Sequence, residues 1–314
     1  DGKQYAFDED GIMLSGWVDE DGTMVNDEDG WADATYYFGS WEDGSMKTGW
    51  QKITVYDDST DKKDDFDYWF NFKSNGKKRV QLESDNTTEN KDATWKNNGK
   101  YYHFDTRGVM VYEWYPTENT TSNLHSASNW SYFNSPEDGA KVVKGWFKVV
   151  PAEYLNEDKY NDDEDFWYYA DGSGNLYAGE FKTIKGKKYA FRDDGRMLNG
   201  LKFIKEDEAN QSLSVYADDH DTYNFDNEDD FLDHAAEFYE PNGYKCFYFG
   251  DGDDGAMRTN KTNVEIDGEN HNFYFEKSGG HKGAGVTGEE DDKLYQSGML
   301  LKADSDDKYI VVEK

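Results

Sequence analysis

Histidine, cysteine and carboxylate side chains are the residues of this chain that could carry out catalysis or hold a metal. The only cysteine is Cys246, and none of the six histidines is spaced from another histidine or cysteine like a metal ligand. No Gly-x-Ser-x-Gly, phosphate-loop or dinucleotide motif is present. The 67 Asp and Glu residues could supply a glycosidase pair by number alone. However, the repeats described below leave no second domain with a core to hold a cleft. The sequence therefore predicts no enzyme, no cofactor and no metal site. The histidines are His103, His125, His220, His234, His271 and His281.

Aromatic residues dominate the apolar part of the chain. They make up 17% of the residues, whereas all hydrophobic residues together reach only 35%. This composition argues against one large aliphatic core and favours small local cores shared between repeats. The formal net charge of −33 repels nucleic acids and anionic lipids. No apolar run approaches the roughly 18 residues of a membrane-spanning helix. We therefore expect neither a nucleic-acid partner nor membrane insertion.

One short segment recurs along the chain. Residues 2–13 read Gly-Lys-Gln-Tyr-Ala-Phe-Asp-Glu-Asp-Gly-Ile-Met, and close copies follow at 99–110 and 186–197. Six turn glycines, at positions 11, 44, 76, 108, 139 and 174, are 31 to 35 residues apart, and later intervals shorten to between 19 and 24. Such a period is typical of a repeat protein. We predict one array of about ten hairpin repeats over residues 1–314, with longer units before about residue 175 and shorter ones after it.

Each repeat has the features of a β-hairpin. Tyr5-x-Phe7 alternates like a strand, and the Asp10-Gly11 step allows the positive φ of a tight turn. A second strand is expected to follow the turn through Met13. Because a lone hairpin is marginal in water, stacking of successive hairpins should bury their aromatic faces. The predicted fold class is all-β, an elongated solenoid of stacked β-hairpin repeats, with a degenerate unit expected around Tyr223 to Phe231.

Three acidic segments interrupt the repeats, at residues 56–67, 156–165 and 218–230. None has the Asp-x-Asp-x-Asp-Gly spacing of a calcium loop. We interpret them as surface loops or elongated hairpin tips.

Three segments carry a family pattern: Asp10-Gly11-Ile12-Met13-Leu14-Ser15-Gly16-Trp17, Asp43-Gly44-Ser45-Met46-Lys47-Thr48-Gly49-Trp50 and Trp167-Tyr168-Tyr169. They resemble the choline-binding and cell-wall-binding repeats of Gram-positive bacteria and their phages. Glucan-binding repeats and clostridial toxin repeats share this hairpin pattern. The resemblance covers nearly the whole chain. It implies a β-solenoid with ligand sites between consecutive repeats. In each site, the tryptophan of one Gly-Trp pair, the first aromatic residue of the next hairpin and a further tyrosine form an open box.

The resemblance implies particular box residues in this chain. The predicted ring pairs are Trp17 with Tyr36, Trp50 with Trp69, Trp114 with Trp130, and Trp146 with Trp167, and Tyr101 and Tyr168 are further candidates. The pair of Trp114 with Trp130 is the weaker match, since Trp114 follows Glu113 rather than glycine. Gly200-Leu201 and Gly179-Glu180-Phe181 replace Gly-Trp, so boxes there should be incomplete. The methionines are expected to serve packing.

Choline suits such a box, because a quaternary ammonium cannot donate hydrogen bonds but is attracted to aromatic faces. The predicted function is a non-catalytic module that anchors a secreted bacterial protein at the cell wall, outside the cell, through choline or teichoic acid. Two alternatives remain open, a module that binds glucan or another cell-surface polysaccharide, and an adhesin-like stalk without a small ligand. The sequence does not separate choline from glucan, because both are bound by Trp and Tyr, and it leaves the number of working sites and the oligomeric state open.

Overall fold

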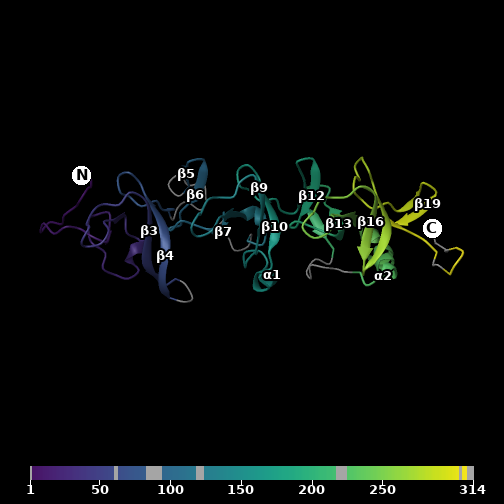
Figure 1. Ribbon diagram of the computed structural model, residues 1–314, viewed down its shortest axis with the longest axis horizontal. Coiled ribbons are helices and arrows are strands. Elements are labelled where there is room, and N and C mark those ends of the chain that lie inside the picture. The colour runs from purple at the N-terminus through teal and green to yellow at the C-terminus, as the bar shows by residue number, and fades with distance from the viewer. Residues whose placement is uncertain are drawn as a thin grey trace. The chain divides into compact units, whose positions relative to one another are not determined.

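The computed structural model describes residues 2–59, 63–82, 94–117, 124–216, 225–303 and 306–309. Within these residues the chain is built mainly of short antiparallel strands, which confirms the predicted all-β class (Figure 1). The solenoid arrangement stays a prediction. The chain divides into two compact units, the first made of residues 1–124, 129–145 and 170–175 and the second of residues 125–128, 146–169 and 176–314.

In the first unit, four two-stranded sheets follow one another along the chain. Their strands are β1 (Trp17–Val18) with β2 (Tyr36–Tyr37), β3 (Gly49–Asp57) with β4 (Asp64–Phe72), β5 (Thr94–Asn97) with β6 (Lys100–His103), and β7 (Glu113–Pro116) with β8 (Trp130–Phe133). Two short 3₁₀ turns are Gly30–Ala32 in this unit and Ala127–Asn129 at its boundary.

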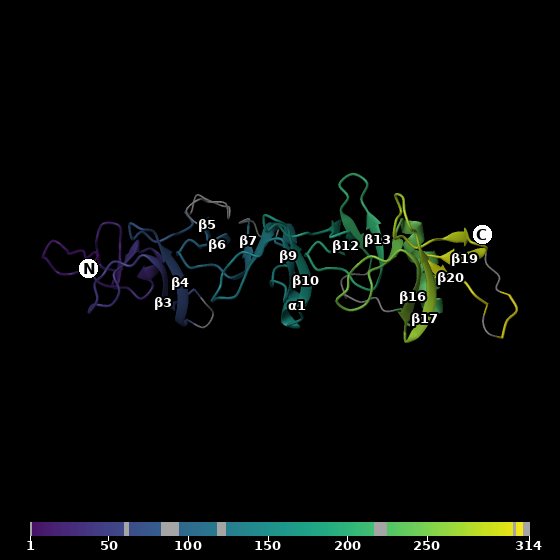
Figure 2. The ribbon, with the colours of Figure 1, turned by 45° about the horizontal axis from the view of Figure 1, so that its top comes forward.

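The second unit contains most of the remaining elements. Its sheets are β9 (Gly145–Val149) with β10 (Phe166–Ala170), β11 (Glu180–Ile184) with β12 (Lys187–Phe191), and a three-stranded sheet of β13 (Leu201–Glu206), β14 (Leu213–Val215) and β15 (Lys245–Tyr248). A five-stranded sheet closes the unit with β16 (Asn260–Ile266), β17 (Glu269–Phe275), β18 (Gly288–Glu290), β19 (Lys293–Gln296) and β20 (Met299–Leu300). Figure 2 shows β16 and β17 as its long hairpin. The helices are α1 (Glu157–Asn161), α2 (Glu228–His234), a π-helical turn (Ala235–Tyr239) and a 3₁₀ turn (Glu240–Asn242).

The strand pairing differs from the expected pairing across the Asp-Gly turn. The strand that starts at a Gly-Trp pair forms the hairpin with the following aromatic strand, as in β3 and β4, where Gly49 faces Phe72. Across the last turn, at Gly298, β19 and β20 do pair as expected, but the segment after an earlier turn contributes an isolated bridge at most, such as Phe104 to Met110. The reason is that its backbone turns to an earlier hairpin, because Met110 N–H donates to the carbonyl of Trp69 at 2.8 Å. For the earlier turns, the predicted second strand through the methionine is therefore wrong, and the methionine segment links neighbouring hairpins instead.

The turn glycines are required by this link between hairpins. Gly76 has a φ of 81°, and a Cβ placed on it would lie 2.4 Å from the sulfur of Met46. Gly139 meets Met110 in the same way, with a φ of 60° and the same 2.4 Å approach. Five of the seven methionines pack in this way on a turn glycine of a later repeat, where the positive φ favours glycine and any side chain would displace the methionine. They are Met13, Met46, Met110, Met197 and Met257. This agrees with the expectation that the methionines serve packing.

Aromatic side chains fill the small cores. In the first unit, Phe70, Phe72 and Trp31 pack with Ile53 and Val55. In the second unit, rings recur in the separate clusters of β11–β12 and of β13, β15 and β17. The expectation of small local cores rather than one large core is met in both units.

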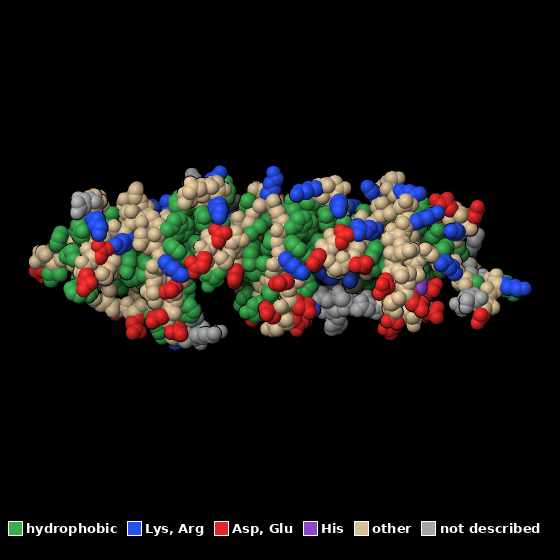
Figure 3. Space-filling view, viewed as in Figure 1, with side chains coloured by type: hydrophobic (Ala, Val, Ile, Leu, Met, Phe, Trp, Pro, Cys, Tyr) green, Lys and Arg blue, Asp and Glu red, His purple; other side chains and the backbone are tan. Residues whose placement is uncertain are grey.

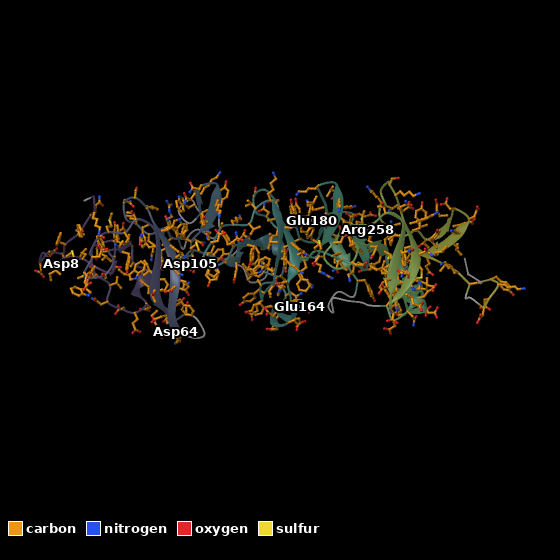
Figure 4. The ribbon with its side chains drawn as sticks, viewed as in Figure 1. Asp8, Asp64, Asp105, Glu164, Glu180 and Arg258 are labelled. Carbon is orange, nitrogen blue, oxygen red and sulfur yellow. The ribbon has the colours of Figure 1, made fainter. Side chains whose placement is uncertain are left out.

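The acidic segments differ from one another where the structure describes them. Asp57 and Asp64 end β3 and β4 at the tip of a long hairpin, as predicted for residues 56–67, of which 60–62 lie outside the described residues (Figure 4). Figure 3 shows acidic side chains gathered at the same tip. Residues 157–161 form α1, capped by the Asn156 side chain, which accepts from the backbone N–H of Lys159. These helical residues were expected as loop or strand.

The predicted degenerate hairpin around residues 223–231 is wrong where the structure describes it. Asn227 caps α2 by accepting a hydrogen bond from the backbone N–H of Asp230, and Phe231 is fully buried in the helix. Tyr223 and most of the third acidic segment lie outside the described residues. The reason for the error is that β13 pairs with β15 across some forty residues, so this insert packs as a helix on the sheet.

Candidate functional site

The first candidate site lies around Trp50 in the first unit. Trp50 in β3 and Trp69 in β4 have ring centroids 6.2 Å apart and planes at 89°. The next hairpin adds Trp95 at 5.6 Å and Tyr102 at 5.1 Å from Trp50, and Phe104 follows at 5.7 Å. Both tryptophans of the pair remain partly exposed, whereas Phe104 is buried. We call these five rings the Trp50 box.

The second candidate site lies around Trp146 in the second unit. Trp146 in β9 and Trp167 in β10 have ring centroids 6.4 Å apart and planes at 90°. Tyr169 lies 5.0 Å from Trp146, and the next hairpin adds Tyr189 at 4.9 Å and Phe191 at 5.8 Å. Hydrophobic side chains reach the surface over β9 and β10 (Figure 3). We call these rings the Trp146 box.

The two boxes are equivalent in the repeat as well as in their ring geometry. Met110 N–H donates to the carbonyl of Trp69 at 2.8 Å, and Met197 N–H donates to the carbonyl of Trp167 at 2.8 Å. The same backbone contact therefore fixes the second tryptophan of each box. A geometry that recurs in two separate compact units reflects the repeat rather than local chance.

A carboxylate and a lysine border each tryptophan pair. Glu137 accepts hydrogen bonds from the Trp69 indole N–H at 3.1 Å and from Lys52 Nζ at 2.6 Å. These two donors, Lys52 first, lower the pKa of Glu137. The carboxylate therefore stays ionised beside the ring and holds the indole in one orientation.

The Trp146 box repeats this polar edge. Asp253 accepts from the Trp167 indole N–H at 3.0 Å and from Lys148 Nζ at 3.0 Å. The same pair of donors lowers the pKa of Asp253, with Lys148 the larger cause. Each box thus combines perpendicular indole rings with a fixed negative charge and a neighbouring lysine.

The third predicted pair is brought together but is built differently. Trp114 and Trp130 lie 6.2 Å apart with planes at 89°. Trp130 is only 6% exposed, and its indole N–H donates to the carbonyl of Leu124 at 2.9 Å. Pro116 occupies the strand position of Lys52 in the Trp50 box, opposite the second tryptophan. Trp130 is therefore packed into the protein, and its indole N–H is bound by a backbone carbonyl rather than by a carboxylate paired with a lysine.

The structure does not bring Trp17 and Tyr36 together. In the β1–β2 ladder, Trp17 faces Tyr37, and their ring centroids are 4.8 Å apart. Tyr36 packs with Phe38 in the cluster of Leu14 and Val18. The reason is strand alternation, because neighbouring side chains point to opposite faces of a strand.

Tyr101 and Tyr168 are also one residue away from the ring that lines a box. Tyr102 and Tyr169 contact the box tryptophans, whereas Tyr101 is exposed beside Lys96 and Tyr168 is fully buried against Phe147. A shift of one residue moves a strand side chain to the other face. Counting strand positions from the buried phenylalanine before each turn would have selected the correct tyrosines.

Sequence reasoning missed several box residues. The missed rings are Trp95, Tyr102, Phe104, Tyr169, Tyr189 and Phe191, and the missed polar residues are Lys52, Glu137, Lys148 and Asp253. The lysines carry a signal, because each stands two residues after the tryptophan of a Gly-Trp pair. The carboxylates come from turns far along the chain and carry none.

Two further observations concern other kinds of site. Among the described residues, no group of three or more His, Cys, Asp and Glu side chains is arranged to hold a metal ion. Within the same residues, no helix has both the length and the apolar character needed to cross a membrane.

Comparisons with known proteins were made by sequence and by structure. No protein-family model matches the chain, and no curated protein matches it. Solved structures do match. CbpJ from Streptococcus pneumoniae TIGR4 is 18% identical over 96% of this chain and 91% of that chain, with a TM-score of 0.40. The modular autolysin LytC from Streptococcus pneumoniae is 19% identical over 96% of this chain and 48% of that chain, with a TM-score of 0.39.

Choline binding protein F from Streptococcus pneumoniae, solved in the presence of a peptidoglycan analogue, is 19% identical over 96% of this chain and 93% of that chain, with a TM-score of 0.37. The solved structures that match this chain thus include choline-binding proteins, the family that its sequence motifs resemble. Because all three TM-scores lie below 0.5, these matches do not establish how the repeats are arranged or what this chain binds.

Proposed function

We propose that this chain is a non-catalytic binding module that takes up choline in the Trp50 box and the Trp146 box. The observation that carries the proposal is the recurrence of one geometry, a perpendicular tryptophan pair with two further rings and an ionised carboxylate, in both compact units. Trp50 and Trp146 each end a Gly-Trp step, as the sequence resemblance implies for a choline box.

The chemistry of choline fits these surroundings. A trimethylammonium group has no N–H to donate, and its positive charge is attracted to the faces of aromatic rings. Two perpendicular ring planes can contact such a compact group on two sides, whereas a flat sugar ring stacks best on one exposed face. Glu137 and Asp253 are each paired with a lysine, so the attraction for cations comes mainly from the net charge of −33. This combination favours a cation over a neutral sugar.

The expected affinity follows from the ring contacts. About three contacts at roughly 0.5 to 2 kcal/mol each give on the order of 4 kcal/mol, which corresponds to a Kd on the order of 1 mM. One such site is too weak to hold a protein on a surface. A polymer that carries many cholines can engage several sites at once, and this raises the overall affinity without new contacts.

We therefore place the module outside the cell, on choline-decorated teichoic acid or a related wall polymer, where it anchors a secreted protein. Successive hairpins stacked as a solenoid would present the boxes one after another along such a polymer. The contacts of five methionines with turn glycines of later repeats support this stacking within each unit.

Isothermal titration of the whole chain with choline and with maltose tests the proposal. We expect saturable millimolar binding of choline and none of maltose, with the stoichiometry reduced by one in Trp50→Ala and in Trp146→Ala. Trp41→Ala is the matched control, since this side chain is 76% exposed and contributes to neither box. Saturable binding of a glucan without choline binding would establish the carbohydrate module instead. Binding of neither ligand would favour the remaining alternative, an adhesin-like stalk without a small ligand.

A further inference from the structure

The rings around Trp17 form a third box of the same design in the first unit. Phe70 and Phe72 of the next hairpin lie 5.1 and 6.1 Å from Trp17, with planes at 67° and 41°. In the Trp50 box, the corresponding rings lie 5.1 and 5.7 Å from Trp50, with planes at 71° and 42°. Tyr37 adds a further wall at 4.8 Å. We call these rings the Trp17 box.

The Trp17 box differs from the Trp50 box at two linked positions. Lys78 N–H donates to the carbonyl of Thr35 at 2.8 Å, in the same way that Met110 N–H donates to the carbonyl of Trp69. Thr35 therefore stands where the Trp50 box has its second tryptophan. Lys78 stands where that box has a methionine, and Met197 holds this position in the Trp146 box.

Lys78 directs its ammonium group into the Trp17 box. The side chain is 5% exposed, and Nζ lies 5.3 Å from the ring centroid of Trp17 and 6.0 Å from that of Phe70. Nζ also donates hydrogen bonds to the carbonyls of Trp31 at 2.8 Å and Ala32 at 2.9 Å. The cation–π distances and the two carbonyl acceptors together make a complete site for a primary amine.

The aliphatic part of Lys78 keeps the packing role of the methionines. A Cβ placed on Gly108 would lie 2.7 Å from Cδ of Lys78, as a Cβ on Gly139 would meet Met110. The replacement of methionine by lysine at this position therefore preserves the link between hairpins. It adds only the charged end, which extends to the rings.

We propose that Lys78 is the intramolecular ligand of the Trp17 box. Cations of the chain also border the other two boxes, where Arg79 lies 4.6 Å from the Trp95 ring and Lys148 lies 5.9 Å from the Trp167 ring. The Lys78 amine instead lies over Trp17 itself, the ring that corresponds to Trp50 and Trp146. The Trp17 box is then a structural joint between the first hairpins, and choline does not enter it. This inference rests on the proposed function for its statement about choline, whereas the position of the amine stands independently of it.

The charges around Lys78 support this role. Burial lowers the pKa of Lys78 to about 7, and this effect is opposed by Asp105, Asp33 and Asp19 and assisted by Arg107. At neutral pH the group is thus balanced between ammonium and amine. Both forms can donate to the two carbonyls, so the joint holds in either state.

The test combines chemical labelling with titration of the whole chain. Acetylation by limiting acetic anhydride at pH 10.5, where ordinary lysine amines are also partly deprotonated, should modify Lys78 at least tenfold more slowly than its neighbour Lys77, which is partly exposed and pairs with Glu20. The extent of labelling is read by mass spectrometry. Saturating choline should leave the protection of Lys78 unchanged. Trp17→Ala should expose Lys78 to acetylation and keep the choline stoichiometry of the wild type, in contrast to Trp50→Ala.

The outcomes separate this inference from the proposed function. Equal labelling of Lys78 and Lys77 would overturn the inference, and so would a tenfold rise of Lys78 labelling on addition of choline, because choline would then displace the amine. A choline site lost in Trp17→Ala would overturn it as well. If neither the wild type nor any variant binds choline, the proposed function fails. The ratio of Lys78 to Lys77 acetylation without choline still decides whether the Lys78 amine is buried in the Trp17 box.

Discussion

Replacing Trp69 by alanine removes one wall of the Trp50 box and leaves the other rings in place. Trp69 contacts Trp50 edge to face and is tied to Glu137 through its indole N–H. An edge-to-face pair contributes about 0.5 to 1.5 kcal/mol to stability, and the hydrogen bond lies at an exposed carboxylate. The folded protein should therefore persist, which separates loss of binding from loss of structure.

The expected effect of Trp69→Ala on binding follows from one lost cation–π contact. A loss of about 0.5 to 2 kcal/mol raises the Kd of this site roughly 2- to 30-fold. The site in the Trp146 box should keep its affinity, so the titration isotherm should separate into a tight and a weak component. Trp167→Ala should give the mirror result because Trp167 has the same partners in its own box.

Calorimetric titration with choline at constant ionic strength measures this change, with circular dichroism as the check on folding. Trp69→Phe is the graded control, because it keeps an aromatic face but loses the N–H that Glu137 orients. Its affinity should fall between the wild type and Trp69→Ala. Choline affinity that is identical in all three proteins would refute the assignment of Trp69 to a ligand site.

Three further predictions concern stability and its dependence on pH. Gly139→Ala should destabilise the fold by roughly 1 to 3 kcal/mol more than Gly99→Ala in urea denaturation. Both glycines have positive φ, but only Gly139 meets Met110. Equal losses of stability in the two variants would contradict the packing of Met110 on Gly139. Burial lowers the pKa of His103 from 6.5 to about 4, so the unfolded chain binds the extra proton between these two pH values. The free energy of unfolding should therefore fall as the pH drops through this range, by up to about 1.4 kcal/mol per pH unit. His103→Gln should reduce this dependence on pH. The pKa of Lys78 is lowered from 10.5 to about 7, so the unfolded chain binds the extra proton between these values and stability should rise with pH there. Lys78→Met should lack this rise, and a rise that persists in the variant would assign it to other groups.

The sequence predicted the aromatic strands and three of the four ring pairs, because both depend on local spacing, but it paired most of these strands with the wrong neighbours. A Gly-Trp pair starts one strand and the next aromatic strand returns beside it, so Trp50 meets Trp69 and Trp146 meets Trp167. The tyrosines were misplaced by one position, since Gly-Trp spacing does not indicate which face of the strand each ring takes. The face is set by the register of the ladder, as between Trp17 and Tyr37.

Features that depend on distant segments could not be predicted from local spacing. Glu137 reaches Trp69 across 68 residues, and Asp253 reaches Trp167 across 86. The same limit explains the region between β13 and β15, where a helix replaced the expected hairpin because burial of Phe231 against the sheet outweighs the repeat pattern. Lys78 stands at a repeat position that holds methionine in the Trp50 and Trp146 boxes, and its contact with the rings of the Trp17 box is seen only in the structure.

The most direct test of the central claim is a crystal structure of the whole chain grown with millimolar choline. Density for a trimethylammonium group should appear against Trp50 and Trp69 and against Trp146 and Trp167, while the amine of Lys78 stays in the Trp17 box. Choline bound away from both tryptophan pairs, or absent from a crystal of protein that titration shows to be saturated, would contradict the account.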